Sequence, residues 1–108
     1  MRTRNGGRHD LDSAESQVET YFQWKVELLG GKTWKTKAIG QRGFPDRIAC
    51  MPNGEMWLVD LKAPHGRVSA LQRQFATDME QLHQRYAVLW GKVSVDIWAK
   101  MYELRTAK

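Results

Sequence analysis

The spacing of apolar positions changes along the chain, and each change predicts a new element. From about Ser13 the apolar residues recur every three or four positions, until Gly30-Gly31 interrupts the pattern. This spacing is typical of an amphipathic helix that ends at a glycine. Residues 32–39 then alternate Lys and Thr with apolar residues and lead into the Gly-containing segment 40–43, which predicts a short strand and a basic loop.

Two apolar runs follow, at Arg47–Met51 and Met56–Leu61, on either side of the sequence Pro-Asn-Gly-Glu. Asn-Gly between apolar runs is a strong turn signal, so we expect an antiparallel hairpin. After a loop, Ser69 opens a second helical pattern, residues 86–90 have the character of a buried strand, and residues 93–102 are again spaced as a helix. The predicted order is αβββαβα, which belongs to the α/β class.

The two ends of the chain lack this periodicity. Residues 1–12 are polar and basic, and we expect a flexible N-terminal arm there, with a basic C-terminal tail at residues 105–108. Residues 13–104 are expected to fold as one domain, because a chain of 108 residues suits a single core.

Composition and charge narrow the class of protein. Apolar residues make up 42% of the chain, and its five Trp, three Tyr and three Phe can fill a core without disulfides. The single Cys50 is expected to pack in a reducing, cytoplasmic setting, and no apolar run approaches the ~20 residues of a membrane helix. A net charge of +5 favours a polyanionic partner, although charge alone leaves the choice of nucleic acid open.

Candidate chemistry lies at one end of the predicted hairpin, where Asp46 precedes the first strand and Asp60 and Lys62 end the second. Residues two apart on a strand project from the same face, so Asp60 and Lys62 can act on one substrate atom. If the turn centres near Asn53, Asp46 lies across from Asp60, where opposed Cβ atoms are roughly 5 Å apart and the carboxylates can share a divalent ion. A shift of one residue in the turn would separate them.

Two opposed carboxylates repel each other, and a bound cation offsets this repulsion. Oxygen ligands without His or Cys select hard ions, so we expect Mg²⁺ or Mn²⁺ and no small-molecule cofactor. Such an ion activates water for phosphodiester hydrolysis, and Lys62 could orient that water or neutralise charge on the phosphate. The plain alternative is a hairpin whose carboxylates form solvated ion pairs with Arg47 and Lys62.

Together these residues resemble the PD-(D/E)XK nuclease superfamily, in which Pro45-Asp46 and Asp60-Leu61-Lys62 would form the motif. A longer ordered set resembles the virus-type replication-repair nuclease (VRR-NUC) family: Glu15–Glu19, Gly30-Gly31, Lys37, Arg42–Arg47, Val59–Ala63, Gly66-Arg67 and Gln72. The resemblance implies a restriction-endonuclease-like αβββαβ core with a mixed sheet flanked by helices. One departure is Asp60, which stands where most members carry Glu.

The resemblance also implies roles for single residues. Asp46 and Asp60 would be metal ligands, with the Leu61 carbonyl as a further candidate, and Lys62 would be the catalytic lysine. Glu15 would help to hold the metal or its water, with Glu19 as the second choice, and Gln72 would belong to the site. Two local alternatives remain open, because Asp12 to Glu15 and Ser69 to Gln72 both fit a helix capping box.

The resemblance predicts a metal-dependent DNA endonuclease that acts as a homodimer on branched or junction DNA, in the cytoplasm of bacteria or of phage-infected cells. Two-fold pairing would give so small a protein a second active site. The rival interpretation is a non-cleaving DNA-binding module of a larger repair complex. We expect most of the tryptophans to pack rather than stack on bases. The candidate phosphate contacts are Lys37, Arg42, Arg47 and Arg67.

Overall fold

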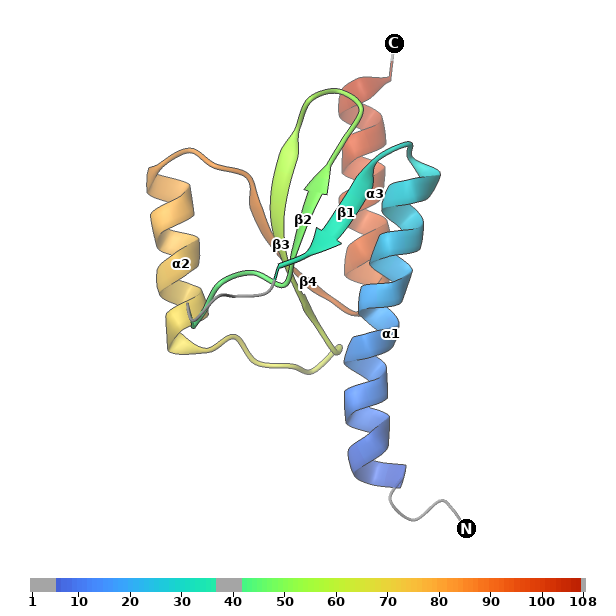
Figure 1. Cartoon of the computed structure of the whole chain (residues 1–108), viewed down its shortest axis with the longest axis vertical. Coiled ribbons are helices and arrows are strands. Elements are labelled where there is room, and N and C mark those ends of the chain that lie inside the picture. Colours follow the sequence, from blue (N-terminus) through green and yellow to red (C-terminus); the bar gives the residue numbers. More distant parts are fainter. Residues whose placement is uncertain (1–5, 37–41, 108) are drawn as a thin grey trace.

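A computed structural model describes residues 6–36 and 42–107 (Figure 1). Within these residues the element order is αβββαβα, as the apolar pattern predicts. The elements are α1 (Gly6–Leu28), β1 (Lys32–Lys35), β2 (Arg47–Cys50), β3 (Met56–Lys62), α2 (Ala70–Gln81), β4 (Tyr86–Trp90) and α3 (Gly91–Thr106). None of the described helices is long and apolar enough to cross a membrane.

The four strands form one mixed sheet in the order β1-β2-β3-β4. The first three strands pair antiparallel, and β4 pairs with β3 in parallel after the crossover through α2. Helices α1 and α3 lie side by side on one side of the sheet, and α2 stands on the other (Figure 1). The mixed sheet flanked by helices is therefore as predicted.

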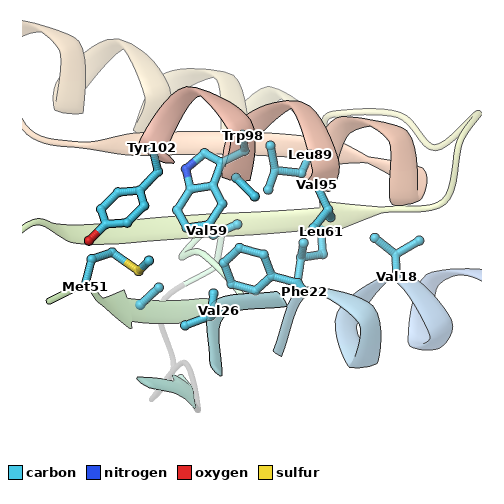
Figure 2. Close-up of a cluster of buried hydrophobic side chains, with 12 residues drawn as sticks. Val18, Phe22, Val26, Met51, Val59, Leu61, Leu89, Val95, Trp98 and Tyr102 are labelled. Carbon is cyan, nitrogen blue, oxygen red and sulfur yellow. The ribbon is translucent and has the colours of Figure 1, made fainter. Parts of the chain in front are cut away.

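The core lies between the sheet and the α1–α3 pair (Figure 2). Phe22 and Val26 of α1 and Val95 of α3 are fully buried against Val59 and Leu61 of β3. Because side chains alternate along a strand, this arrangement sends Asp60 to the opposite face, towards α2. Burial of the neighbours on either side of Asp60 thus fixes the direction of the functional residue.

The five tryptophans and the single cysteine differ in how deeply they are buried. Trp98 is buried in the core and contacts the half-buried Trp57 ring to ring at 5.7 Å. Trp24, Trp34 and Trp90 keep between 38% and 49% of their surface exposed, so core packing accounts for only two of the five. Cys50 is half-buried on β2 with a free thiol.

Helix α1 begins earlier than predicted. It starts at Gly6, so residues 6–12, which were expected to form a flexible arm, have a helical backbone. Once the residues from Val18 to Val26 are anchored by packing, each further residue adds one hydrogen bond to an existing helix, and no apolar periodicity is needed to extend it. The same start excludes the proposed capping box at Asp12 to Glu15, because both residues lie inside the helix.

The C-terminal boundary also differs, because Arg105 belongs to α3 and not to a tail. Its guanidinium donates to both carboxylate oxygens of Glu55, at 2.9 and 3.1 Å. Glu55 closes the β2–β3 turn and also accepts from Trp57 Nε1 at 2.8 Å and Asn53 Nδ2 at 3.0 Å. This long-range contact ties the end of α3 to the hairpin turn, and local sequence spacing cannot indicate it.

Candidate active site

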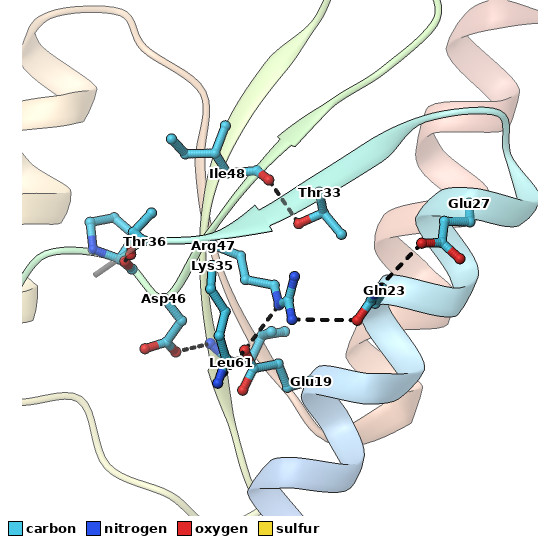
Figure 3. A network of polar contacts seen from close by, with 11 residues as sticks. Glu19, Gln23, Glu27, Thr33, Lys35, Thr36, Asp46, Arg47, Ile48 and Leu61 are labelled. Atoms are coloured by element: carbon cyan, nitrogen blue, oxygen red, sulfur yellow. Dashed lines mark hydrogen bonds and ion pairs between the residues drawn. The ribbon is translucent and has the colours of Figure 1, made fainter. Parts of the chain in front are cut away.

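The hairpin register places the two aspartates across from each other. Arg47 pairs with Val59 and Cys50 with Met56, so the pairing centres on Asn53 and brings Asp46 opposite Asp60 one position further along. The side chain of Asp46 turns towards β3, where Oδ2 accepts the Leu61 N–H at 2.8 Å (Figure 3). The opposition predicted from the Asn-Gly turn is thus confirmed, and a backbone donor fixes one of the two carboxylates.

Asp60 is enclosed by the protein and only half satisfied. Its side chain is 0% exposed, and one oxygen, Oδ2, accepts a hydrogen bond from the Tyr86 hydroxyl on β4. The other oxygen, Oδ1, makes no hydrogen bond to the described part of the chain. A buried carboxylate oxygen without a partner is destabilising unless a cation or a proton occupies it.

Burial raises the pKa of both aspartates. Loss of hydration is the main cause for each, and the neighbouring charge adds to it: Asp46 acts on Asp60, and Glu19 acts on Asp46. The Leu61 N–H lowers the pKa of Asp46, the Tyr86 hydroxyl lowers that of Asp60, and Lys62 lowers both, without cancelling the rise. The pair is therefore short of positive charge, as expected for a site that binds a cation.

Lys62 follows Asp60 on β3 and shares its face of the sheet, as the spacing predicts. The loop after β3 passes close above it: a Cβ built on Gly66 would lie 3.2 Å from Lys62 Cβ and 3.2 Å from the Ala63 carbonyl. Trp90 holds this loop by donating its indole N–H to the Gly66 carbonyl at 2.9 Å. Gly66 thus permits a close turn beside the lysine.

A cavity of about 270 Å³ opens beside Asp46, between α1 and the edge of β1. Glu15 and Glu19 of α1 line it together with Lys35 and Thr36, so the structure brings the first-helix acids near Asp46. Glu19 is engaged with Arg47 at 2.9 Å and lies 3.9 Å from Lys35. Glu15, one turn earlier on α1, is exposed, and its role as the α1 acid of the site stays a prediction.

Two predicted site residues have structural roles instead. Arg47 is only 7% exposed, and its guanidinium donates to Glu19 and, at 3.4 Å, to Gln23, so it is not available to a phosphate (Figure 3). Gln72 forms the capping box of α2 with Ser69: its Oε1 accepts the Ser69 N–H at 3.0 Å, while Ser69 Oγ accepts the Gln72 N–H at 3.1 Å. Gln72 thus takes the capping role that was left open, whereas Arg47 forms a buried pair with Glu19 of α1 in place of the predicted phosphate contact or solvated pair.

The other basic residues predicted to contact phosphate are two exposed loop arginines and one lysine that the structure does not describe. Arg42 and Arg67 are exposed on the loops that lead into Asp46 and out of Lys62, whereas Lys37 lies outside the described residues. Sequence reasoning missed Lys35, which lines the cavity beside Asp46, and Tyr86, which binds Asp60. The alternation of Lys and Thr in β1 hinted at Lys35, but Tyr86 reaches the site only because β4 pairs in parallel with β3.

The residues present suit a hard divalent ion with few protein ligands. Among the described residues, no group of three or more His, Cys, Asp and Glu side chains is arranged to hold a metal. The carboxylates of Asp46 and Asp60 offer oxygen ligands only, and the buried Oδ1 of Asp60 has no hydrogen-bond partner in residues 6–36 and 42–107. Mg²⁺ is commonly held by one or two carboxylates and completes its shell with water, so this donor set fits it.

No family model matches the chain. A search of curated proteins finds "Putative nuclease p44" of Acyrthosiphon pisum secondary endosymbiont phage 1, which is 34% identical in a match that covers 56% of this chain and 76% of that protein. Among solved structures, one described as "VRR_NUC domain" superposes with a TM-score of 0.70 at 20% identity, covering 88% of this chain and 98% of its own. The chain belongs to the VRR-NUC family.

The comparison with the solved VRR-NUC domain concerns the fold, since the two sequences share only 20% of their residues. It confirms the expected restriction-endonuclease-like architecture, with a mixed four-stranded sheet and flanking helices. In this VRR-NUC chain the motif residues Asp46, Asp60 and Lys62 gather at one end of the β2–β3 hairpin.

Proposed function

We propose that this VRR-NUC protein is a divalent-metal-dependent endonuclease that hydrolyses phosphodiester bonds in DNA. The observation that carries the proposal is the pair formed by Asp46 and Asp60. They are opposed across the hairpin, both have a raised pKa, and one buried oxygen of Asp60 has no partner in the part of the chain that the structure describes. A purely structural carboxylate in such a place would be expected to have its hydrogen bonds filled. Family membership supports the same activity.

Each residue of the site has a distinct task in this proposal. A bound Mg²⁺ or Mn²⁺ would supply an activated water and polarise the phosphoryl oxygen. Asp46 and Asp60 would hold the ion, and the Leu61 carbonyl is a further candidate ligand. Lys62 presents an ammonium on the same face as Asp60, where it orients the attacking water or neutralises negative charge on the phosphate. Glu15, on the α1 side of the cavity, would hold a metal-bound water.

DNA would approach along the basic loops around this end of the sheet. The net charge of +5 favours binding to phosphates, and the exposed Arg42 and Arg67 flank the motif on both sides. Lys35, beside Asp46, is exposed and replaces the buried Arg47 as a candidate phosphate contact. These contacts would position the backbone and carry little sequence information.

The proposed homodimer has a candidate surface on α3. Four apolar residues at spacings of four, four and three keep between 52% and 72% of their surface exposed, so they form one stripe on the side of the helix away from the core: Val93, Ile97, Met101 and Leu104. A continuous apolar stripe of this kind is typical of a helix that packs against a partner.

The charges beside the stripe favour a second copy of the same helix as that partner. In an antiparallel two-fold pairing that places Ile97 opposite Met101, the apolar residues at the two ends of the stripe also meet. The same register brings the exposed Lys100 of one copy within one helical turn of the exposed Asp96 of the other, along one flank of the stripe. Asp96 also pairs with Lys25 at 3.1 Å and keeps 51% of its side chain exposed.

A dimer of this kind would present two active sites related by a two-fold axis, which suits branched DNA with symmetric arms. To test it, we would measure the mass of the wild type and of Ile97→Asp by light scattering. We expect a dimer for the wild type and a monomer for the variant. Leu82→Asp, which adds the same charge at a residue that is 61% exposed beyond α2, should stay dimeric. A wild-type monomer, or a dimeric Ile97→Asp, would disprove this interface.

The decisive test of function is cleavage of labelled linear, nicked, flap and four-way-junction DNA in Mg²⁺ and Mn²⁺. The wild type should cut, most efficiently on the branched substrates, while Asp60→Asn and Lys62→Ala should bind without cutting. Asp78→Asn is a matched control, because it removes an exposed carboxylate from α2. DNA binding that survives EDTA, with no cleavage in either metal, would instead identify a non-cleaving binding module.

A further inference from the structure

The contacts of Asp60 extend through β4 to α2. We propose that Tyr86 is a positioning residue, which holds the Asp60 carboxylate by one oxygen so that the other remains free for the metal ion. We infer that α2 in turn holds Tyr86 through an aromatic chain. The inference rests on the proposed metal-dependent function and assigns roles to a helix and a tyrosine outside the motif.

The hydrogen bond from Tyr86 divides the two oxygens of Asp60. The parallel register pairs Tyr86 with Leu58 and Asp60 with Val88, so the tyrosine lies diagonally beside Asp60 on the same face of the sheet. Its hydroxyl donates to Oδ2, and Oδ1 has no partner among the described residues. Asp60 is 0% exposed, so bulk water does not compete for either oxygen. A fixed carboxylate with one open oxygen is prepared for a single coordinating bond.

The tyrosine is suited to act as a permanent donor. A tyrosine hydroxyl has an ordinary pKa of about 10, so at neutral pH it keeps the proton that it donates to Asp60. Hydrogen-bond partners of metal ligands fix the orientation of those ligands and tune their affinity for the metal. Without the hydroxyl, the Asp60 side chain would lose the contact that distinguishes Oδ2 from Oδ1.

A chain of rings links Tyr86 to α2 and to the segment before Asp46. Phe75 of α2 lies 5.4 Å from the Tyr86 ring and 5.4 Å from the Phe44 ring, which it meets edge to face. Phe44 is two residues from Asp46, so the same helix touches the structural supports of both aspartates. Nearby, a Cβ on Gly43 would lie 2.9 Å from Leu71 Cβ, which shows how closely this segment packs against the start of α2.

These ring contacts join α2 to β4 and to the segment before Asp46. None of the residues of α2 is buried, and the helix stands apart from the larger core formed with α1 and α3 (Figure 1). Aromatic pairs of this geometry contribute about 0.5–1.5 kcal/mol each beyond the area they bury. The position of α2 and the geometry of the metal ligands are therefore coupled through Phe75.

The test is direct binding of Mn²⁺ to the protein without DNA, followed by electron paramagnetic resonance. Tyr86→Phe keeps the ring and its packing and removes only the hydroxyl. We expect its Kd for Mn²⁺ to rise about 10–100-fold, the usual effect of losing a partner of a metal ligand. Tyr21→Phe is the matched control, because it removes a similar hydrogen bond, from Tyr21 to Asp96 at 2.6 Å, away from the site. Its Kd should equal that of the wild type.

A second readout separates positioning from stability. In cleavage assays the Mg²⁺ concentration at half-maximal rate should rise for Tyr86→Phe, while kcat approaches the wild-type value at saturating Mg²⁺. A merely structural tyrosine would instead lower Tm and leave the affinity for Mn²⁺ unchanged. Equal or tighter Mn²⁺ binding by Tyr86→Phe would overturn the positioning role. If the wild type itself binds no Mn²⁺, the proposed function fails, and the inference fails with it.

The proposed role of α2 is tested with a separate variant at Phe75. Phe75→Leu keeps an apolar side chain but removes both ring contacts, and we expect a smaller rise in the Kd for Mn²⁺ than for Tyr86→Phe. A folded Phe75→Leu protein, verified by its circular dichroism spectrum, with wild-type affinity would overturn the coupling to α2 while leaving the role of Tyr86 intact.

Discussion

The β2–β3 hairpin carries acidic residues at both ends, and the two ends differ in nearly every respect. At the turn, Glu55 accepts from Arg105, Trp57 and Asn53, and the Arg105 guanidinium is the main cause that lowers its pKa to about 2. At the open end, Asp46 and Asp60 face each other, and burial raises the pKa of both. One end is satisfied by the chain itself, whereas at the other end the described residues leave one buried oxygen of Asp60 without a partner.

The difference teaches how to distinguish a structural carboxylate from a functional one. Both Glu55 and Asp60 are buried, so burial does not separate them. What separates them is whether the protein supplies the positive charge and the hydrogen-bond donors. Glu55 has them in full, whereas among the described residues Asp60 accepts the Tyr86 hydroxyl at Oδ2 and its Oδ1 accepts no hydrogen bond. We therefore expect the same chemical change at the two ends to have opposite effects.

The largest expected effect is on DNA cleavage, when the acid at each end of the hairpin is replaced by its amide. Asp60→Asn should lower the rate of DNA cleavage at least about 100-fold, because the site loses a metal ligand. Glu55→Gln should cleave at the wild-type rate, since it lies at the far end of the hairpin. Single-turnover cleavage in Mg²⁺ would measure both. Comparable losses in the two variants would show that the hairpin ends are not functionally distinct.

The two ends of the hairpin should also differ in how much added Mn²⁺ stabilises their variants. Adding Mn²⁺ at 100 times its Kd should stabilise the wild type by about 2.7 kcal/mol, because the folded state alone binds the ion. Asp60→Asn should gain much less, whereas Glu55→Gln should gain as much as the wild type. Thermal unfolding with and without Mn²⁺ gives the comparison. A stabilisation retained in Asp60→Asn would place the ion elsewhere.

At the turn end, removal of the Arg105 guanidinium should lower the stability of the protein and leave its activity unchanged. Arg105→Met keeps an unbranched stem but leaves Glu55 without its charged partner, and we expect a loss of about 1–2 kcal/mol. The estimate is modest because the Arg105 side chain is 42% exposed. Urea unfolding would measure it, with Arg85→Met as the control for an exposed arginine. An undiminished stability would mean that solvent screens the pair.

The order of elements and the hairpin could be predicted because both depend on local signals. The Asn-Gly turn set the register to within one residue, and this register alone places Asp46 across from Asp60. Alternation along β3 likewise gave the shared face of Asp60 and Lys62. These predictions needed only backbone periodicity and turn chemistry.

The supports of the site could not be predicted, because they come from segments far apart in the sequence. Tyr86 reaches Asp60 through parallel strand pairing, and Arg105 reaches Glu55 across 50 positions. The sequence predicts Arg47 as a phosphate contact, but in the folded protein it is buried and paired with Glu19 of α1. Gln72 fitted both a catalytic and a capping role, and only the hydrogen bonds with Ser69 distinguish them. For Tyr86, Arg105 and Arg47 tertiary contacts decide the role of the polar residue, whereas for Gln72 the deciding contact is local.

The smallest expected effects are in the pH dependence of stability without metal. Glu55 has a lowered pKa when folded, so its stabilisation is complete above the ordinary pKa of about 4.5 and is lost as the pH falls towards 2. Asp60 has a raised pKa, so the folded state takes up its proton first and becomes more stable, relative to the unfolded state, as the pH falls through that raised value. The measurement is urea unfolding in EDTA from pH 7 to pH 3. At pH 7 the free energy of unfolding should be lower for Glu55→Gln than for the wild type, and higher for Asp60→Asn. Both differences should shrink towards pH 3.

Plots of the free energy of unfolding against pH that stay parallel to the wild type would mean that neither carboxyl changes its pKa on folding. The contrast between the two ends of the hairpin would then lose its electrostatic basis.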